Sequence, residues 1–181
     1  MKSIRKREIV QAILFLLLAA FLFFAMPRYV AERIIVDGDS MEMTLKNNDN
    51  IIIEKVSKHF GGYNRFDIIV FYPTEEAKKQ GERYYVKRII GLPGETVQIL
   101  YGMVYIDGRP LPENYGFSEM DHAGIAAEPL TLGADEYFVL GDNRYVSEDS
   151  RSVRLGPVPA NRIEGRMILR ISPLKSFGTV D

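Results

Sequence analysis

One serine stands at the end of a turn that follows an apolar run, where a hydroxyl can act as a nucleophile. The run at 34–36 leads into Asp-Gly-Asp at 37–39, and Ser40 comes next. A reactive side chain on a turn beside a rigid strand is a common way to present a nucleophile. The same residues also form an ordinary surface turn, so partners elsewhere must distinguish the two interpretations. If the strand continued through the turn, alternation would place four residues on one face: Ile34, Val36, Gly38 and Ser40.

A lysine can act as the general base for a serine when its amine is neutral, and Lys87 is the candidate. Burial disfavours the ammonium form and lowers a lysine pKa by up to several units. Lys87 lies in a strand predicted over 83–90, which is rich in aromatic and β-branched residues. Alternation puts Lys87 on the face of Tyr85. The opposite face then takes Val86 and Arg88, so the pattern leaves the burial of Lys87 open, and strand lysines commonly face solvent.

Other bases and metal ligands are scarce in the chain. It has no cysteine, which excludes thiolate catalysis, disulfides and cysteine-based zinc sites. The two histidines, His59 and His122, lie in polar stretches and lack metal-ligand spacing. The net charge of −1 over 181 residues gives no indication of nucleic-acid binding.

A polar cluster follows directly on a strand predicted at 136–140. Residues 141–151 include two aspartates, two arginines, one asparagine and two serines. As a solvated loop, such charge pairs would contribute little stability. The same side chains could instead hold a catalytic lysine by a hydrogen bond and fix its surroundings by ion pairs.

The N-terminal segment predicts a membrane anchor. Residues 9–26 are apolar apart from Gln11, and eighteen helical residues span about 27 Å, enough for the hydrocarbon core. More basic residues precede the segment than follow it, which places the N-terminus in the cytoplasm and the remainder outside. We therefore expect a cytoplasmic tail at 1–8, a transmembrane signal-anchor helix at 9–26 and an extracytoplasmic domain at 27–181.

A cleaved signal peptide is the alternative for this segment. Its apolar region would usually be shorter and would end at a small-x-small site. Here the apolar run stays bulky up to its boundary, and Pro27 follows, where we expect the helix to stop. An uncleaved anchor is therefore favoured.

Beyond the anchor, short β-rich runs alternate with turn signals, and little helix is predicted outside a polar connection at 75–80. Closely spaced short strands indicate a mainly β barrel or sandwich. The stretch at 113–127 has no period and is expected to be a loop. The predicted strands are at 50–56, 66–72, 83–90, 96–100, 103–106, 136–140 and 162–171.

Together, these stretches resemble bacterial type I signal peptidase, a membrane-anchored serine endopeptidase with a Ser/Lys dyad. The resemblance spans nearly the whole chain, and the short single-anchor form is similar to Gram-positive members. It implies a catalytic domain built as a β-barrel or coiled β-sheet, with 96–131 as a hairpin and loop insertion. The matching segments are 38–45, 65–71, 85–94, 141–151 and 156–165.

The resemblance implies a role for each site residue. Ser40 attacks the scissile carbonyl, and neutral Lys87 takes its proton and later protonates the leaving amine. Ser147 orients the lysine, and Gly38 lies near the oxyanion hole. Two structural ion pairs shape the site, Asp142 with Arg88 and Asp149 with Arg151.

The resemblance also implies the substrate and the partners. Shallow apolar pockets would accept small residues of the Ala-x-Ala type in the signal peptides of secreted preproteins, bound as an extended strand. The enzyme would act at the cell membrane, with the lipid bilayer as its other partner, without nucleic acid and without a metal or organic cofactor. The implied pocket residues are Ile34, Val36, Met41, Leu45, Tyr85 and Val86.

Two departures from the family pattern affect these expectations. Met43 stands where family members usually carry proline, so we expect Met43→Pro to leave activity unchanged or to raise it. Gly38 stands where some members carry a serine that donates to the oxyanion, so the oxyanion hole must rely on the Ser40 backbone N–H, and a neighbouring amide or a water is left as the second donor. A specialised peptidase or a non-catalytic membrane-anchored homologue that binds exported proteins is the alternative function. A self-cleaving repressor would need a DNA-binding helix where this chain has the apolar segment.

Overall fold

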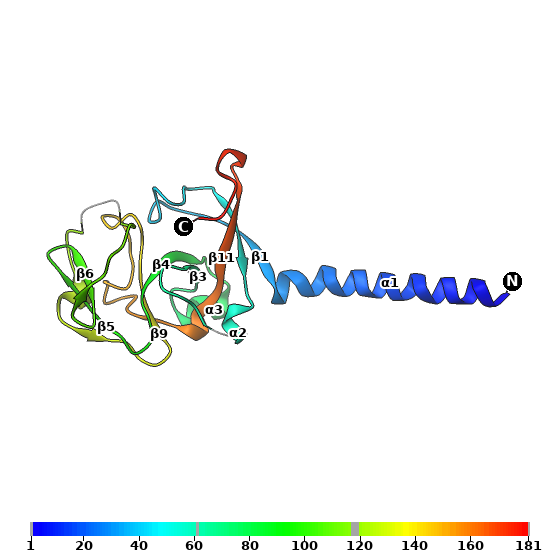
Figure 1. Ribbon diagram of the computed structural model, residues 1–181, viewed down its shortest axis with the longest axis horizontal. Helices are drawn as coiled ribbons and strands as arrows, with labels where there is room; N and C mark the ends of the chain where they lie inside the picture. Colours follow the sequence, from blue (N-terminus) through cyan, green and yellow to red (C-terminus); the bar gives the residue numbers. More distant parts are fainter. Residues whose placement is uncertain (1, 61, 117–119, 181) are drawn as a thin grey trace.

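A long N-terminal helix projects from a mainly β body (Figure 1). The structure is a computed structural model that describes residues 2–60, 62–116 and 120–180. Helix α1 (Lys2–Tyr29) contains a stretch, Lys6–Phe24, with a mean hydropathy of 2.1, and none of that stretch is buried against the rest of the chain. Its length and composition are sufficient to cross a membrane.

The prediction that Pro27 ends this helix is wrong, because α1 continues to Tyr29. A proline removes one backbone N–H donor and crowds the carbonyl four residues earlier. The missing donor removes a single hydrogen bond near the end of α1, and the helix continues for two residues beyond Pro27.

The larger sheet has seven strands, and every neighbouring pair is antiparallel. Its edge strand β1 follows α1 directly, so the N-terminal helix meets the body at this edge (Figure 1). In spatial order the strands are β1 (Ala31–Ile35), β2 (Asn50–Glu54), β11 (Ile163–Ser172), β3 (Ile68–Phe71), β4 (Tyr85–Gly91), β9 (Glu136–Leu140) and β10 (Val158–Pro159).

A smaller four-stranded sheet lies at the end of the body away from α1 (Figure 1). It is built on the hairpin of β5 and β6, whose bounds are those predicted from the alternation and the Tyr101-Gly102 turn. In spatial order its strands are β7 (Arg109–Pro110), β6 (Met103–Ile106), β5 (Thr96–Leu100) and β8 (Leu130–Thr131).

Burial follows the sequence pattern of each strand. In β2 and β5 buried positions alternate with partly exposed ones, as expected for strands with one face on the core. β3 is buried throughout, and β4 is buried at every position after Tyr85, so these neighbouring central strands are covered on both faces. A lysine carried within β4 is therefore placed in the interior.

The remaining elements are short. Helix α3 (Glu75–Gln80) is the predicted helical connection; the Thr74 hydroxyl caps its start and Gly81 ends it with a left-handed backbone, φ 66°. The others were not predicted, because each is too short to show a period: α2 (Ser57–Phe60) and the 3-10 turns η1 (Gly124–Ala127), η2 (Ala160–Arg162) and η3 (Leu174–Ser176).

The prediction of a mainly β fold after an apolar helix is confirmed. The conditional strand through Ser40 is not formed, because β1 ends at Ile35 and Gly38 has φ 99°. Such a backbone angle turns the chain and favours glycine. The predicted loop at 113–127 is largely irregular among the residues that the structure describes, and 117–119 lie outside them.

Candidate active site

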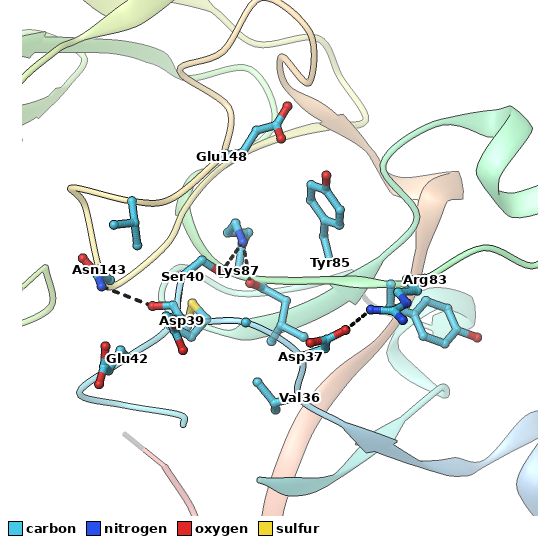
Figure 2. Close-up of a pocket in the computed structure, with 15 residues that line it drawn as sticks. Val36, Asp37, Asp39, Ser40, Glu42, Arg83, Tyr85, Lys87, Asn143 and Glu148 are labelled. Carbon is cyan, nitrogen blue, oxygen red and sulfur yellow. Dashed lines mark hydrogen bonds and ion pairs between the residues drawn. The ribbon is translucent and has the colours of Figure 1, made fainter. Parts of the chain in front are cut away.

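The structure brings the amine of Lys87 to the hydroxyl of Ser40. The two side chains point toward one another from β4 and from the turn after β1 (Figure 2). Lys87 Nζ lies 2.7 Å from Ser40 Oγ, across 47 positions of sequence. This separation is within hydrogen-bond reach, the distance that a proton transfer from the hydroxyl requires.

The Lys87 amine is buried away from solvent. The Lys87 residue is only 4% exposed, and its Nζ also donates to the Val86 carbonyl at 3.1 Å. Burial lowers the pKa of Lys87 from 10.5 to about 8, although the carboxylates of Asp149, Glu148 and Asp142 oppose the shift. Because desolvation penalises the ammonium, a substantial fraction of the amine is neutral slightly above neutral pH.

Activity that depends on a neutral Lys87 should rise with pH. Below pH 8 the amine is charged and cannot accept a proton, so kcat/KM should climb about tenfold per pH unit and level off above that pKa. Steady-state rates from about pH 5 to 10, with thermal unfolding measured at each pH, check this expectation. A profile that stays flat while the protein remains folded would contradict the role of Lys87 as base.

The chain after Ser40 makes a tight turn that is fixed from three sides. The backbone N–H of Leu45 donates to the Met41 carbonyl at 2.7 Å. The Thr44 hydroxyl donates to Asp142 Oδ2 at 2.5 Å, and Arg170 Nη1 donates to the Thr44 carbonyl at 2.9 Å. The polar cluster at 141–151 and strand β11 therefore both hold the segment that carries the nucleophile.

Met43 lies in this turn with a left-handed backbone, φ 81°. Proline fixes φ near −65°, so this backbone angle argues against the expectation that Met43→Pro preserves or raises activity. We predict instead that the substitution lowers the free energy of unfolding by more than about 1 kcal/mol and reduces the activity that depends on Ser40. Thermal unfolding and steady-state rates measure the two effects.

Met43→Gly is the matched control for that substitution. Glycine adopts positive φ without strain, and the Met43 residue is 70% exposed, so little packing is lost. We expect this variant to keep wild-type stability and activity. Equal activity of the proline and glycine variants would show that the turn rearranges at no cost.

Arg88 and Asp142 form a buried ion pair beside the turn. Arg88 Nη2 lies 2.7 Å from Asp142 Oδ2 and Nε lies 2.9 Å from Oδ1, and both residues are at most 1% exposed. The guanidinium also donates to the Phe66 carbonyl at 3.0 Å and lies 3.6 Å from the centre of the Tyr115 ring. With Thr44 as a further donor, the Asp142 carboxylate is fully engaged and fixes the turn relative to β4.

Asp149 and Arg151 form a second buried pair within the loop itself. Arg151 Nε and Nη2 lie 2.8 and 2.9 Å from the two carboxylate oxygens, and the Gly141 N–H donates to Asp149 Oδ2 at 3.2 Å. A Cβ on Gly141 would lie 2.4 Å from the Ser40 carbonyl oxygen and 2.3 Å from Ser147 Oγ. Only glycine at this position lets the loop approach the nucleophile so closely.

Ser147 lies at this junction, but its hydroxyl does not hold the lysine in this structure. The residue is 8% exposed, and its Oγ is buried without a hydrogen-bond partner among the described residues. A buried hydroxyl without a partner is costly, so the group is available to bond an amine or a bound substrate. Its expected role in orienting Lys87 stays a prediction.

The Ser40 and Lys87 side chains open into a cleft of about 560 Å³. Of the predicted pocket residues, Val36, Met41, Tyr85 and Val86 line it, together with Gly38. Ile34 lines an adjoining side hollow of about 460 Å³. Leu45 was expected in a pocket, but it is not among the residues that line the cleft and is fully buried in the core, in the same cluster as Met41.

Four contacts around the nucleophile were not predicted. The Asn143 N–H donates to the Ser40 carbonyl at 3.1 Å, and the Asn143 side chain donates to the Asp39 carbonyl at 3.2 Å (Figure 2). The Thr44 and Arg170 contacts described above complete the set. Asn143 could have been suspected from its place in the polar cluster, whereas Arg170 lies in a predicted strand where nothing in the sequence marked it as part of the site.

Comparison with known proteins identifies relatives over most of the chain. Residues 6–172 match the family model described as signal peptidase, peptidase S26. A signal peptidase I of Leptolyngbya laminosa is 43% identical over 164 residues, which cover 89% of this chain and 78% of the relative. A probable signal peptidase I-2 of Synechocystis sp. is 39% identical over 167 residues, 88% of this chain and 72% of the relative. A crystal structure of a signal peptidase I from Enterococcus faecalis is 35% identical, with a TM-score of 0.45, and the match covers 57% of this chain and 95% of that one.

Proposed function

The chain belongs to the peptidase S26 family of signal peptidases, enzymes that process signal peptides, and from this premise we propose that it cleaves exported preproteins with Ser40 as nucleophile and Lys87 as general base. The observation that carries the proposal is the 2.7 Å contact between Lys87 Nζ and Ser40 Oγ, with the lysine side chain buried. A nucleophile within hydrogen-bond reach of a neutral base is the arrangement that serine acylation requires.

The reaction follows from this geometry. Neutral Lys87 accepts the proton of Ser40 as Oγ attacks the scissile carbonyl, and the ammonium then protonates the leaving amine. Water hydrolyses the acyl group on Ser40, with Lys87 again taking a proton. Backbone N–H groups at the turn, Ser40 among them, stabilise the oxyanion, and losing one such donor typically costs about 10²–10³ in rate.

Two unpaired strand edges favour binding of an extended substrate. Among the described residues, β1 pairs with β2 on one side only. The first half of β4, Tyr85–Lys87, pairs with β3, whereas β9 pairs with β4 from Arg88 onward. A peptide added as a strand beside these edges would reach Ser40 with its side chains over the apolar lining of the cleft. Shallow apolar walls of this kind suit small residues such as alanine beside the cleaved bond.

Anchoring by α1 supports the same function. The helix carries an apolar stretch long enough to span a bilayer and leads directly into β1, the first wall of the substrate groove. Basic residues before the stretch favour a cytoplasmic N-terminus, with the β body on the opposite side of the cell membrane. Enzyme and membrane-bound preprotein would then meet on one surface.

Incubation of the purified full-length chain in detergent with a preprotein tests the proposal. We expect one cut after a small residue at the end of the signal peptide, identified by mass spectrometry of both products. Stable binding without any cut would favour a non-catalytic homologue, and cleavage of only a narrow set of exported proteins would favour a specialised peptidase.

A further inference from the structure

An ion pair crosses the groove on the way to Ser40. Asp37 lies in the turn after β1, and Arg83 lies just before β4, so the two residues come from opposite walls (Figure 2). Their side chains form an ion pair although they are 62% and 87% exposed. The pair is therefore on the open side of the groove, where a bound peptide would meet it.

The pair marks the point where the cleft joins the side hollow, which we call the waist. The residues that line both spaces are Val36, Asp37, Arg83, Tyr84 and Val86. Of these, only Asp37 and Arg83 carry charge. An extended peptide that fills both spaces must pass this point, with an apolar floor on one side and the ion pair on the other.

We propose that Asp37 and Arg83 are a specificity-determining pair that selects uncharged substrate side chains at the waist. The inference rests on the proposed function, because the peptide that it describes is the signal peptide. With both charges satisfied by each other, a charged substrate residue gains no partner there and gives up hydration. Each charge, once its partner is removed, attracts a substrate residue of the opposite sign and repels one of the same sign.

The expected size of the effect follows from the exposure of the pair. Two unit charges about 4 Å apart in a water-like dielectric attract enough to change a rate about fivefold. Such an effect fades when the Debye length falls to about 3 Å near 1 M salt. Because exposed ion pairs contribute little to stability, removing either charge should leave the protein folded.

A reciprocal charge experiment tests the pair. Signal-peptide substrates carry Lys, Glu or Gln in turn at each of the five positions before the cleaved bond, and kcat/KM is measured at low and high salt. Arg83→Gln should shift preference toward Lys about fivefold at one position, and Asp37→Asn should shift it toward Glu at the same position. The double variant Asp37→Arg with Arg83→Asp should return to the wild-type preference for Gln.

Arg109→Gln on β7 is the matched control, since it removes an exposed arginine of the other sheet. It should change no preference. The measured quantity is the ratio of kcat/KM for the Lys substrate to that for the Glu substrate. The proposal is refuted if Arg83→Gln and Asp37→Asn leave this ratio unchanged at every position, or shift it in the same direction, while the wild type cleaves normally. If the wild type cleaves none of the peptides, the proposed function itself fails.

Discussion

Replacing Ser40 with alanine or Lys87 with methionine should abolish preprotein cleavage while the protein still folds. Loss of a serine nucleophile typically removes the whole effect of the catalytic unit, on the order of 10⁶ in kcat. Loss of a general base typically removes about 10²–10⁴. Rates in single-turnover assays, with the product identified by mass, measure both losses.

Methionine is chosen at position 87 because it fills the same volume without a charge. Lys87 is almost completely buried, so an apolar replacement removes a desolvation cost and should keep or raise the unfolding temperature. A loss of activity in a variant that is as stable as the wild type is therefore a chemical effect. Residual cleavage within tenfold of the wild type in either variant would remove that residue from the mechanism.

Breaking the buried pair between Arg88 and Asp142 should have the largest effect on stability. Arg88→Met leaves the fully buried carboxylate without its partner, which typically costs about 3–5 kcal/mol. For a chain of this size, that loss lowers the unfolding temperature by roughly 10 °C. Activity should fall as well, because the freed carboxylate also holds Thr44 in the nucleophile turn.

Two further variants separate the pair from a general effect of losing an arginine. Arg88→Met combined with Asp142→Leu removes both charges and should cost less stability than the single change. Arg154→Gln removes an arginine that is 81% exposed in its pair with Glu148, and stability should hardly change. If Arg88→Met alone were as stable as the double variant, the Asp142 carboxylate would have found another partner, and the pair would not have the stabilising role assigned to it.

Local sequence patterns predicted the elements whose residues are adjacent in the chain. The hairpin of β5 and β6 was found at its observed bounds because strict alternation and a tight turn lie side by side in the chain. Ser40 and Lys87 could be paired before their distance was known, because the chain offers few other bases and both lie in recognisable motifs. Their approach to 2.7 Å depends on how β1 and β4 are placed in the sheet.

The features that were missed depend on contacts between distant parts of the chain or on backbone angles. Met41 and Leu45 are both buried in one core cluster, but of the two Met41 lines the cleft, and no sequence pattern separates them. Met43 carries no signal for a positive φ, which glycine or asparagine would have given. Arg170 reaches Thr44 across 126 residues, and no local pattern predicts such a bond.

The central claim is that a neutral amine faces the serine hydroxyl, and the titration of Lys87 tests it most directly. Nuclear magnetic resonance of the full-length protein, labelled with ¹³C at the lysine ε-carbons, reports each amine, and the signal absent from Lys87→Met identifies the one in question. We expect that signal to titrate with a midpoint at about pH 8. A midpoint at or above the ordinary lysine value of about 10.4 would contradict the account, since the amine would then be charged wherever the enzyme works.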